Sequence, residues 1–209
     1  MPTTRDALRR GTRAGVLTVA TELFRDRGFE ATTIRDIAEL AQVSVGTVMS
    51  VGDKSALLVQ IFDEGIERLH VQRDASHLVE TRGSTGSCAE SVFELLQPFV
   101  RLFAGQADLA RSYASILVAG KHSSKVFAEL ATVLRQEIQT VVSCQHGGCA
   151  SDPEARAVAI YFAYIGMLFT WSADGSVAGD VASPSEAAGL SDLLRTTLAE
   201  SCTCKEETR

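Results

Sequence analysis

The segment from Thr33 to Lys54 constrains the fold most, because it has the pattern of two short helices joined by a tight turn. Thr33 is followed three residues later by Asp36, which is the spacing of a capping box at the start of a helix. Ser44 is a second helix N-cap, directly after a turn at Gln42 and Val43. The second helix is too short to be stable alone, so it must pack on the first and leave its other face exposed. This pattern predicts a helix-turn-helix, whose second helix reads DNA in the major groove.

The rest of the chain also follows helical periodicity, and no segment of useful length alternates with the period of a β-strand. The sequence therefore predicts an all-α protein. Residues 1–8 are expected to be a frayed basic arm, and Arg82–Ser87 is a loop close to a domain boundary. Outside the helix-turn-helix, helices are expected at about residues 9–27, 54–78, 88–103, 107–120, 123–144, 153–173 and 185–201.

Charge is unevenly distributed along the 209 residues, which carry a net charge of −6. The first 13 residues contain Arg5, Arg9, Arg10 and Arg13 against only Asp6. A local basic arm on an acidic protein favours site-specific DNA binding over general binding of nucleic acid.

Several other classes of protein are disfavoured by what the sequence lacks. No basic region precedes an apolar run at the N-terminus, so we expect no signal peptide and a cytoplasmic protein. The longest apolar run, near residues 157–171, is too short and too polar for a membrane span. No nucleophile–base motif, phosphate loop or carboxylate pair stands out, so we expect neither an enzyme nor a cofactor.

From Val16 to Phe62 the chain resembles the DNA-binding domain of the tetracycline-repressor (TetR) family of bacterial regulators. The resemblance lies in the stretches ATELFRDRGFEATTIRDIAELAQVSVGTV and DKSALLVQIF. It implies a homodimeric regulator, most often a repressor, that a small effector releases from a palindromic double-stranded DNA operator. It also implies a helix-turn-helix DNA-binding domain over residues 1–53, a connecting helix over 54–82, and a helical effector-binding and dimerisation domain over 83–209.

Positions that match the family's motif supply the predicted DNA contacts. Thr33 and Lys54 would hold phosphates, whereas Arg35 and Thr47 could reach base edges. The alternative is that Thr33 is only a helix cap and Lys54 only a solvated lysine, and for Thr33 both roles can hold together. The full predicted DNA-binding set is Arg9, Arg10, Thr33, Arg35, Val45, Gly46, Thr47 and Lys54.

The chain departs from the family pattern just after the second helix begins. Met49 stands where most members carry a phosphate-contacting tyrosine, and the segment before Lys54 is one residue shorter. A thioether cannot donate a hydrogen bond to phosphate. Because Val45 and Gly46 also lack polar groups, we expect contact with thymine methyl groups and DNA shape to contribute to recognition.

The C-terminal region is rich in large apolar residues, and in the family the equivalent region holds a small-molecule pocket. Taken singly, each of these residues is explained more simply as plain core than as part of a ligand pocket. The candidate effector-binding residues are Phe99, Phe103, Tyr113, His122, Phe127, Tyr164, Met167 and Trp171. The run from Tyr161 to Trp171 is apolar on several faces, which predicts a dimer interface formed by the last two helices.

Five cysteines, an odd number, indicate mostly free thiols in a reducing compartment. Cys144 and Cys149 flank His146 in a glycine-containing loop, but their spacing is not a usual zinc pattern and we expect no metal. Two alternatives stay open: a thiol- or metal-sensing regulator of the same fold that would use Cys144, Cys149, Cys202 or Cys204, and a ligand- or protein-interaction module that has lost DNA binding.

Overall fold

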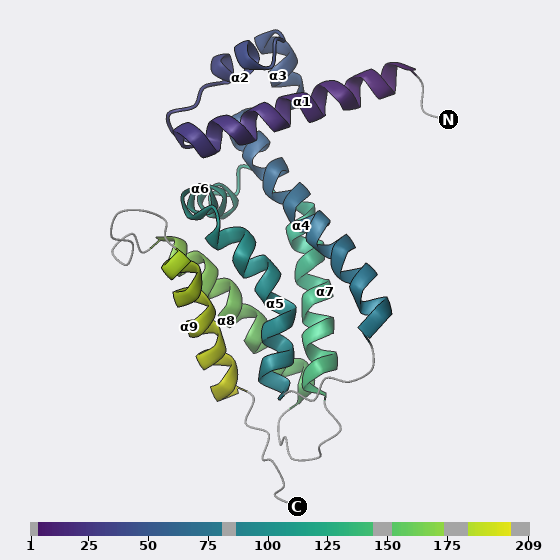
Figure 1. The fold of residues 1–209 in the computed structure, drawn as a ribbon, viewed down its shortest axis with the longest axis vertical. Coiled ribbons are helices and arrows are strands. Elements are labelled where there is room, and N and C mark those ends of the chain that lie inside the picture. The colour runs from purple at the N-terminus through teal and green to yellow at the C-terminus, as the bar shows by residue number, and fades with distance from the viewer. Residues whose placement is uncertain (1–3, 81–86, 144–151, 174–183, 202–209) are drawn as a thin grey trace, which may run out of the picture. The chain divides into compact units, whose positions relative to one another are not determined.

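The computed structural model describes residues 4–80, 87–143, 152–173 and 184–201, and within these ranges it contains nine helices and no strand. Figure 1 shows their order along the chain. This architecture confirms the predicted all-α class. The helices are α1 (Thr4–Arg27), α2 (Ile34–Leu40), α3 (Val45–Val51), α4 (Lys54–Glu80), α5 (Cys88–Ala104), α6 (Ala107–Val118), α7 (Lys125–Val142), α8 (Pro153–Ala173) and α9 (Pro184–Ser201).

The expected frayed arm is the clearest error of the sequence-based prediction. Helix α1 begins at Thr4, so from that residue onward the arm is helical. Residues 5–15 are all exposed, and the first buried side chain of α1 is Val16. The apolar periodicity that revealed the rest of α1 is absent from this extension, whereas Asp6 in the first turn favours a helix start electrostatically.

The chain forms two compact units that are not contiguous in sequence. Unit 1 comprises Met1–Gly65 and Asp108–Ser124, and unit 2 comprises Ile66–Ala107 and Lys125–Arg209. Helix α6 therefore belongs mostly to the same unit as the helix-turn-helix, although the sequence suggested the C-terminal region. A stacked ring pair explains this placement, because Tyr113 of α6 lies against Phe62 of α4 with 4.5 Å between ring centroids.

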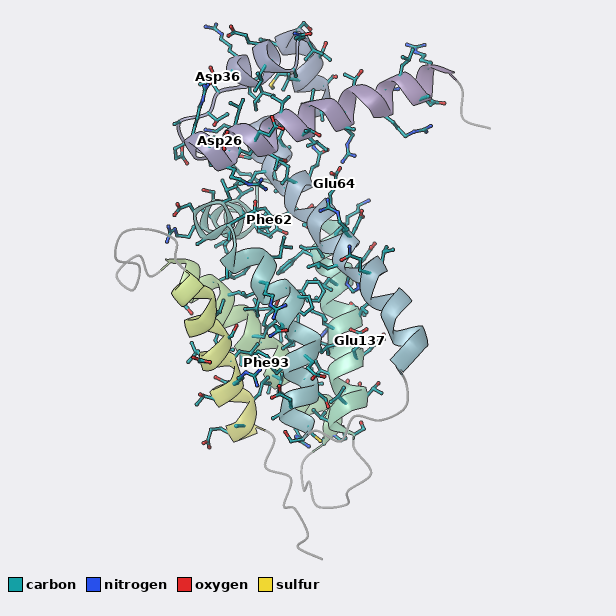
Figure 2. All side chains as sticks on the ribbon, in the orientation of Figure 1. Asp26, Asp36, Phe62, Glu64, Phe93 and Glu137 are labelled. Carbon is teal, nitrogen blue, oxygen red and sulfur yellow. The ribbon has the colours of Figure 1, made fainter. Side chains whose placement is uncertain are left out.

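In unit 2, helix α5 packs against α7 and α9, and α8 packs against the same two helices. Helix α9 buries a stripe of leucines spaced four residues apart, which are Leu190, Leu194 and Leu198. Arg195 holds α9 to α5, since its guanidinium bonds both carboxylate oxygens of Glu90 at 2.7 and 2.9 Å. The same guanidinium lies 3.7 Å from the ring centroid of Phe93, which Figure 2 labels on α5. No helix in the described ranges is long and apolar enough to cross a membrane.

Candidate nucleic-acid interface

Helix α2 starts with the predicted capping box. The backbone N–H of Asp36 donates to the Thr33 hydroxyl at 3.2 Å, and the backbone N–H of Thr33 donates to the Asp36 carboxylate at 2.8 Å. Figure 2 labels Asp36 at this helix start. Hydrogen bonds from the Thr33 side chain and backbone hold the pKa of Asp36 below its ordinary value. The box is therefore intact at neutral pH and opens only as the pH falls through that lowered pKa.

Helix α3 is held on α2 by the turn between them and by one buried side chain. Gln42 occupies the turn with a φ of 56°, and the backbone N–H of Val43 donates to Ala38 at 3.0 Å. Ser44 caps α3, because its hydroxyl accepts from the backbone N–H of Thr47 at 3.0 Å. Val48 is fully buried, so the residues on the opposite side of this single helical segment face outward.

The outward face of α3 is largely apolar. Val45 is 44% exposed and Met49 is 50% exposed, and both lie on the predicted reading helix. Gly46 and Ser50 are also exposed, whereas Thr47 is partly covered. The predicted base-contacting positions therefore share one accessible surface, and Arg35 of α2 is exposed as well.

Lys54 is placed differently from a solvated lysine. Its ammonium group donates to the backbone carbonyls of Phe29 at 3.0 Å and Glu30 at 3.3 Å, in the turn that follows α1. It also lies 3.9 Å from the Glu30 carboxylate and 4.4 Å from the centroid of the Phe29 ring. These contacts tie the start of α4 to the α1–α2 turn. The assignment of Lys54 to a DNA phosphate remains a prediction, and such a contact would compete with these carbonyls.

Sequence reasoning missed a polar relay that supports the end of α3. The Arg13 guanidinium donates to the Gln60 side-chain oxygen at 3.0 Å, and the Gln60 amide donates to the Val51 carbonyl at 3.2 Å. Arg13 also pairs with Glu64 at 3.1 Å. Because Arg13 and Gln60 are 47 residues apart, no local pattern could have revealed the contact. The relay satisfies a C-terminal carbonyl of α3 and links it to α1 and α4.

We expect Gln60→Ala to weaken operator binding by about two- to tenfold, which corresponds to the loss of one or two net hydrogen bonds. The effect should arise from a less firmly placed α3, because Gln60 is not itself on the reading face. Fluorescence anisotropy with operator DNA measures the affinity, and circular dichroism confirms the helical content. Gln136→Ala, at an exposed position of α7, is the matched control and should change neither. Equal affinities for the two variants would refute this role.

A second support comes from the segment after α6. The His122 ring nitrogen Nε2 lies 3.3 Å from the Asp53 carboxylate, and that carboxylate caps α4 by accepting from the backbone N–H of Ala56 at 2.8 Å. The Ser124 hydroxyl donates to Asp63 at 2.6 Å. The two contacts attach this segment to the N-terminal half of α4, the helix that follows the predicted reading helix.

The eight candidate effector residues fall into both units. Tyr113 and His122 lie in unit 1, where burial raises the pKa of the Tyr113 phenol and its hydrogen bond with Ser124 opposes the rise. In unit 2, Phe99, Phe103 and Tyr164 are buried, Phe127 and Met167 are partly exposed, and the Trp171 side chain lies outside the described residues. The Phe127 ring stacks on Phe169 with 6.2 Å between centroids. Their role in effector binding remains a prediction.

Of the five cysteines, only Cys88 lies within the described ranges, and it is disulfide-bonded. Cys144, Cys149, Cys202 and Cys204 lie outside them, as does His146. Within the described part of the chain, no cluster of three or more histidine, cysteine or acidic residues could hold a metal ion.

The helix-turn-helix segment resembles a known protein family. Residues 16–50 match the model of bacterial regulatory proteins of the tetR family. That range includes the buried face of α1, the capping box of α2 and almost all of α3. No curated protein sequence is significantly similar to the chain.

Solved structures show similarity in fold over most of the chain. The TetR-family transcriptional repressor FadR of Thermus thermophilus, in complex with lauroyl-CoA, has 23% identity and a TM-score of 0.60, and the match covers 94% of this chain and 98% of FadR. FadR from Bacillus subtilis, in complex with stearoyl-CoA, has 16% identity and a TM-score of 0.60, covering 90% and 98%. BioQ, solved with its double-stranded DNA operator, has 18% identity and a TM-score of 0.54, covering 90% and 98%. Residues 16–50 thus resemble the bacterial regulatory proteins of the tetR family, and the chain has the fold of TetR-family transcriptional regulators such as FadR.

Proposed function

We propose that this protein is a DNA-binding transcriptional regulator, most simply a repressor, that binds a palindromic operator as a homodimer in the cytoplasm. The observation that carries the proposal is the exposed face of α3 on a tetR-family module. The helix is buried on one side through Val48 and open on the other, as a major-groove reading helix must be. BioQ, which has the same fold, was solved on its operator.

The homodimer is supported by an exposed face of α8. Apart from Glu154 in the first turn, its exposed residues follow helical spacing and are mostly small, with a single aromatic ring: Ala155, Ala159, Phe162, Gly166 and Thr170. Phe162 is 62% exposed, and Leu193 of α9 is 49% exposed. A second copy of the chain would cover both side chains. Two copies would also place two reading helices about 34–36 Å apart, one turn of DNA.

The effector we propose is a small, largely apolar organic molecule bound within unit 2. The support is compositional, because α5, α7 and α8 carry many large apolar side chains in this unit. Two proteins of the same fold were solved with fatty acyl-CoA ligands. An acyl chain fits the proposed apolar character, whereas the anionic coenzyme A group would need cationic partners. The effector would favour a conformation with a helix spacing that no longer fits the operator.

Substitutions should separate the roles of the predicted DNA contacts. We expect Thr47→Ala and Arg35→Ala to cost about 1–3 kcal/mol on the selected operator and much less on random DNA, because base contacts specify. Removal of residues 1–10 should weaken binding to both DNAs and lower the salt slope by about 0.9 for each lost phosphate contact. Gel shifts over a range of salt concentrations measure both quantities.

Lys54→Ala distinguishes the two roles open to that residue. If Lys54 contacts a phosphate, Lys54→Ala should lower the salt slope. If Lys54 instead anchors the α1–α2 turn, the substitution should lower the melting temperature and leave the slope unchanged. Equal effects of all these changes on operator and random DNA would contradict the assigned roles.

Binding of the effector should raise the thermal stability of the protein. A ligand present at 100 times its dissociation constant is expected to add about 2.7 kcal/mol to the free energy of unfolding, and the same ligand should release operator DNA. A melting-temperature screen should contain neutral apolar compounds, free fatty acids, acyl-CoA esters and free coenzyme A as matched arms. The proposal is contradicted if only metals or oxidants change both the melting temperature and the DNA affinity.

A response to oxidants alone would favour the alternative of a thiol-sensing regulator. The observation that supports this alternative is that Cys88 is disulfide-bonded. Oxidation by a peroxide would convert two thiols and one H2O2 into a disulfide and two waters. Dithiothreitol should then reverse the change in DNA affinity, and Cys88→Ser should abolish the response. If oxidant and reductant leave operator affinity unchanged, this alternative is excluded.

A further inference from the structure

The hydroxyl groups of the α3 segment are engaged in hydrogen bonds within that segment. The Ser44 hydroxyl accepts from the backbone N–H of Thr47 and lies 2.9 Å from the Thr47 hydroxyl, where either oxygen can donate. The Ser50 hydroxyl donates to the Thr47 carbonyl at 2.7 Å. At most one hydroxyl proton of the Ser44–Thr47 pair therefore remains for a base edge.

The accessible area between these hydroxyls is apolar. Val45 and Met49 are four residues apart, so their side chains adjoin on the same face of the helix. No described helix covers them, since 44% and 50% of these residues remain exposed. Neither an isopropyl group nor a thioether can donate a hydrogen bond. Val45 and Met49 therefore cannot recognise bases by donating hydrogen bonds to them.

Gly46, which lies beside this pair, has no side chain that projects from the helix. A Cβ atom added at Gly46 would meet only the Ser44 hydroxyl oxygen, at an ordinary contact distance of 3.7 Å. The packing of the chain therefore does not require glycine here, although glycine within a helix is unfavourable. The missing side chain instead lets the α3 backbone approach an external surface closely.

Among the groups that bases present in the DNA major groove, one is apolar and can therefore pack favourably against Val45 and Met49. Thymine alone presents a methyl group, at C5, whereas the other base edges present hydrogen-bond donors and acceptors. We infer that Val45 and Met49 are specificity-determining residues that contact thymine methyl groups in each operator half-site. This inference rests on the proposed function, because it requires α3 to enter the major groove.

Uracil substitution tests the inference on the DNA side. The full-length protein first selects its operator from random duplex DNA, and each thymine of that operator is then replaced in turn by uracil. The replacement removes the methyl group and leaves base pairing intact. At the contacted positions we expect affinity to fall about three- to fivefold per methyl, and symmetric replacement in both half-sites should multiply the two losses.

Matched variants test it on the protein side. Val45→Ala and Met49→Ala should bind the thymine operator about as weakly as the uracil operator, so that the ratio between the two affinities falls towards one. Val118→Ala, at a 77% exposed valine of α6, should keep the ratio of the unmodified protein. Circular dichroism of each variant checks that the fold is intact.

The outcomes separate this inference from the proposed function. If an operator is selected but uracil replacement changes its affinity at no position, Val45 and Met49 do not read methyl groups, and the regulator function stands. If uracil lowers the affinity but both alanine variants keep the full ratio, other residues read the methyl groups and the inference is wrong. If selection enriches no sequence, the proposed function itself fails.

Discussion

Phe162→Arg is expected to leave the protein monomeric and to reduce its affinity for a palindromic operator by a factor between about 10² and 10⁴, because the second half-site is no longer bound by a linked module. Phe162 is 62% exposed in the single chain, although its ring contacts Tyr161 edge-on at 5.6 Å. Its substitution should therefore change the stability of the protomer by only about 0.5 kcal/mol. In a dimer, the new guanidinium would be buried in an apolar interface without a partner, which is costly.

The design separates loss of the dimer from loss of the fold. Sedimentation equilibrium measures the oligomeric state, and gel shifts with whole and half operators measure affinity. Val133→Arg is the control, since this residue of α7 in the same unit is also an exposed apolar side chain. A dimer with full operator affinity after Phe162→Arg would show that α8 does not form the interface.

Gly52→Ala is expected to lower both the free energy of unfolding and operator affinity. A Cβ atom at this position would lie 2.8 Å from the Ala56 Cβ atom and 3.1 Å from the Gln60 amide nitrogen. The Ala56 methyl group cannot rotate away, so α3 must shift relative to α4. Overpacking of this kind costs about 1–3 kcal/mol, and the displaced α3 would no longer match the groove.

Gly46→Ala is the matched substitution on the same helix, with the opposite expected effect on stability. Its new methyl group has room, so the free energy of unfolding should rise by roughly 0.5–1 kcal/mol, while operator affinity should fall because the backbone can no longer approach the bases. Chemical denaturation and anisotropy measure the two quantities. If Gly52→Ala changes neither the free energy of unfolding nor operator affinity, the close approach of Gly52 to α4 does not matter for function. If Gly46→Ala binds the operator normally, DNA binding does not need the α3 backbone to approach the bases closely at Gly46.

The sequence alone determined the features that depend on neighbours a few residues apart. The capping box at Thr33 and Asp36, the Ser44 cap and the starts of α4, α5, α6 and α8 all follow from such local spacing. Helical periodicity likewise predicted the all-α class, because each buried stripe repeats every three or four residues. Residues 5–8 carry no such stripe, which is why the helix was not predicted to extend over them.

Only the tertiary structure decided which distant segments meet. It places α6 with the helix-turn-helix through Tyr113 and Phe62, and it directs the Lys54 ammonium to carbonyls 24 and 25 residues away. It also joins Arg13 to Gln60. Such contacts depend on how whole helices pack, and packing is set by complementary side-chain shape across elements rather than by the spacing of residues along any one of them.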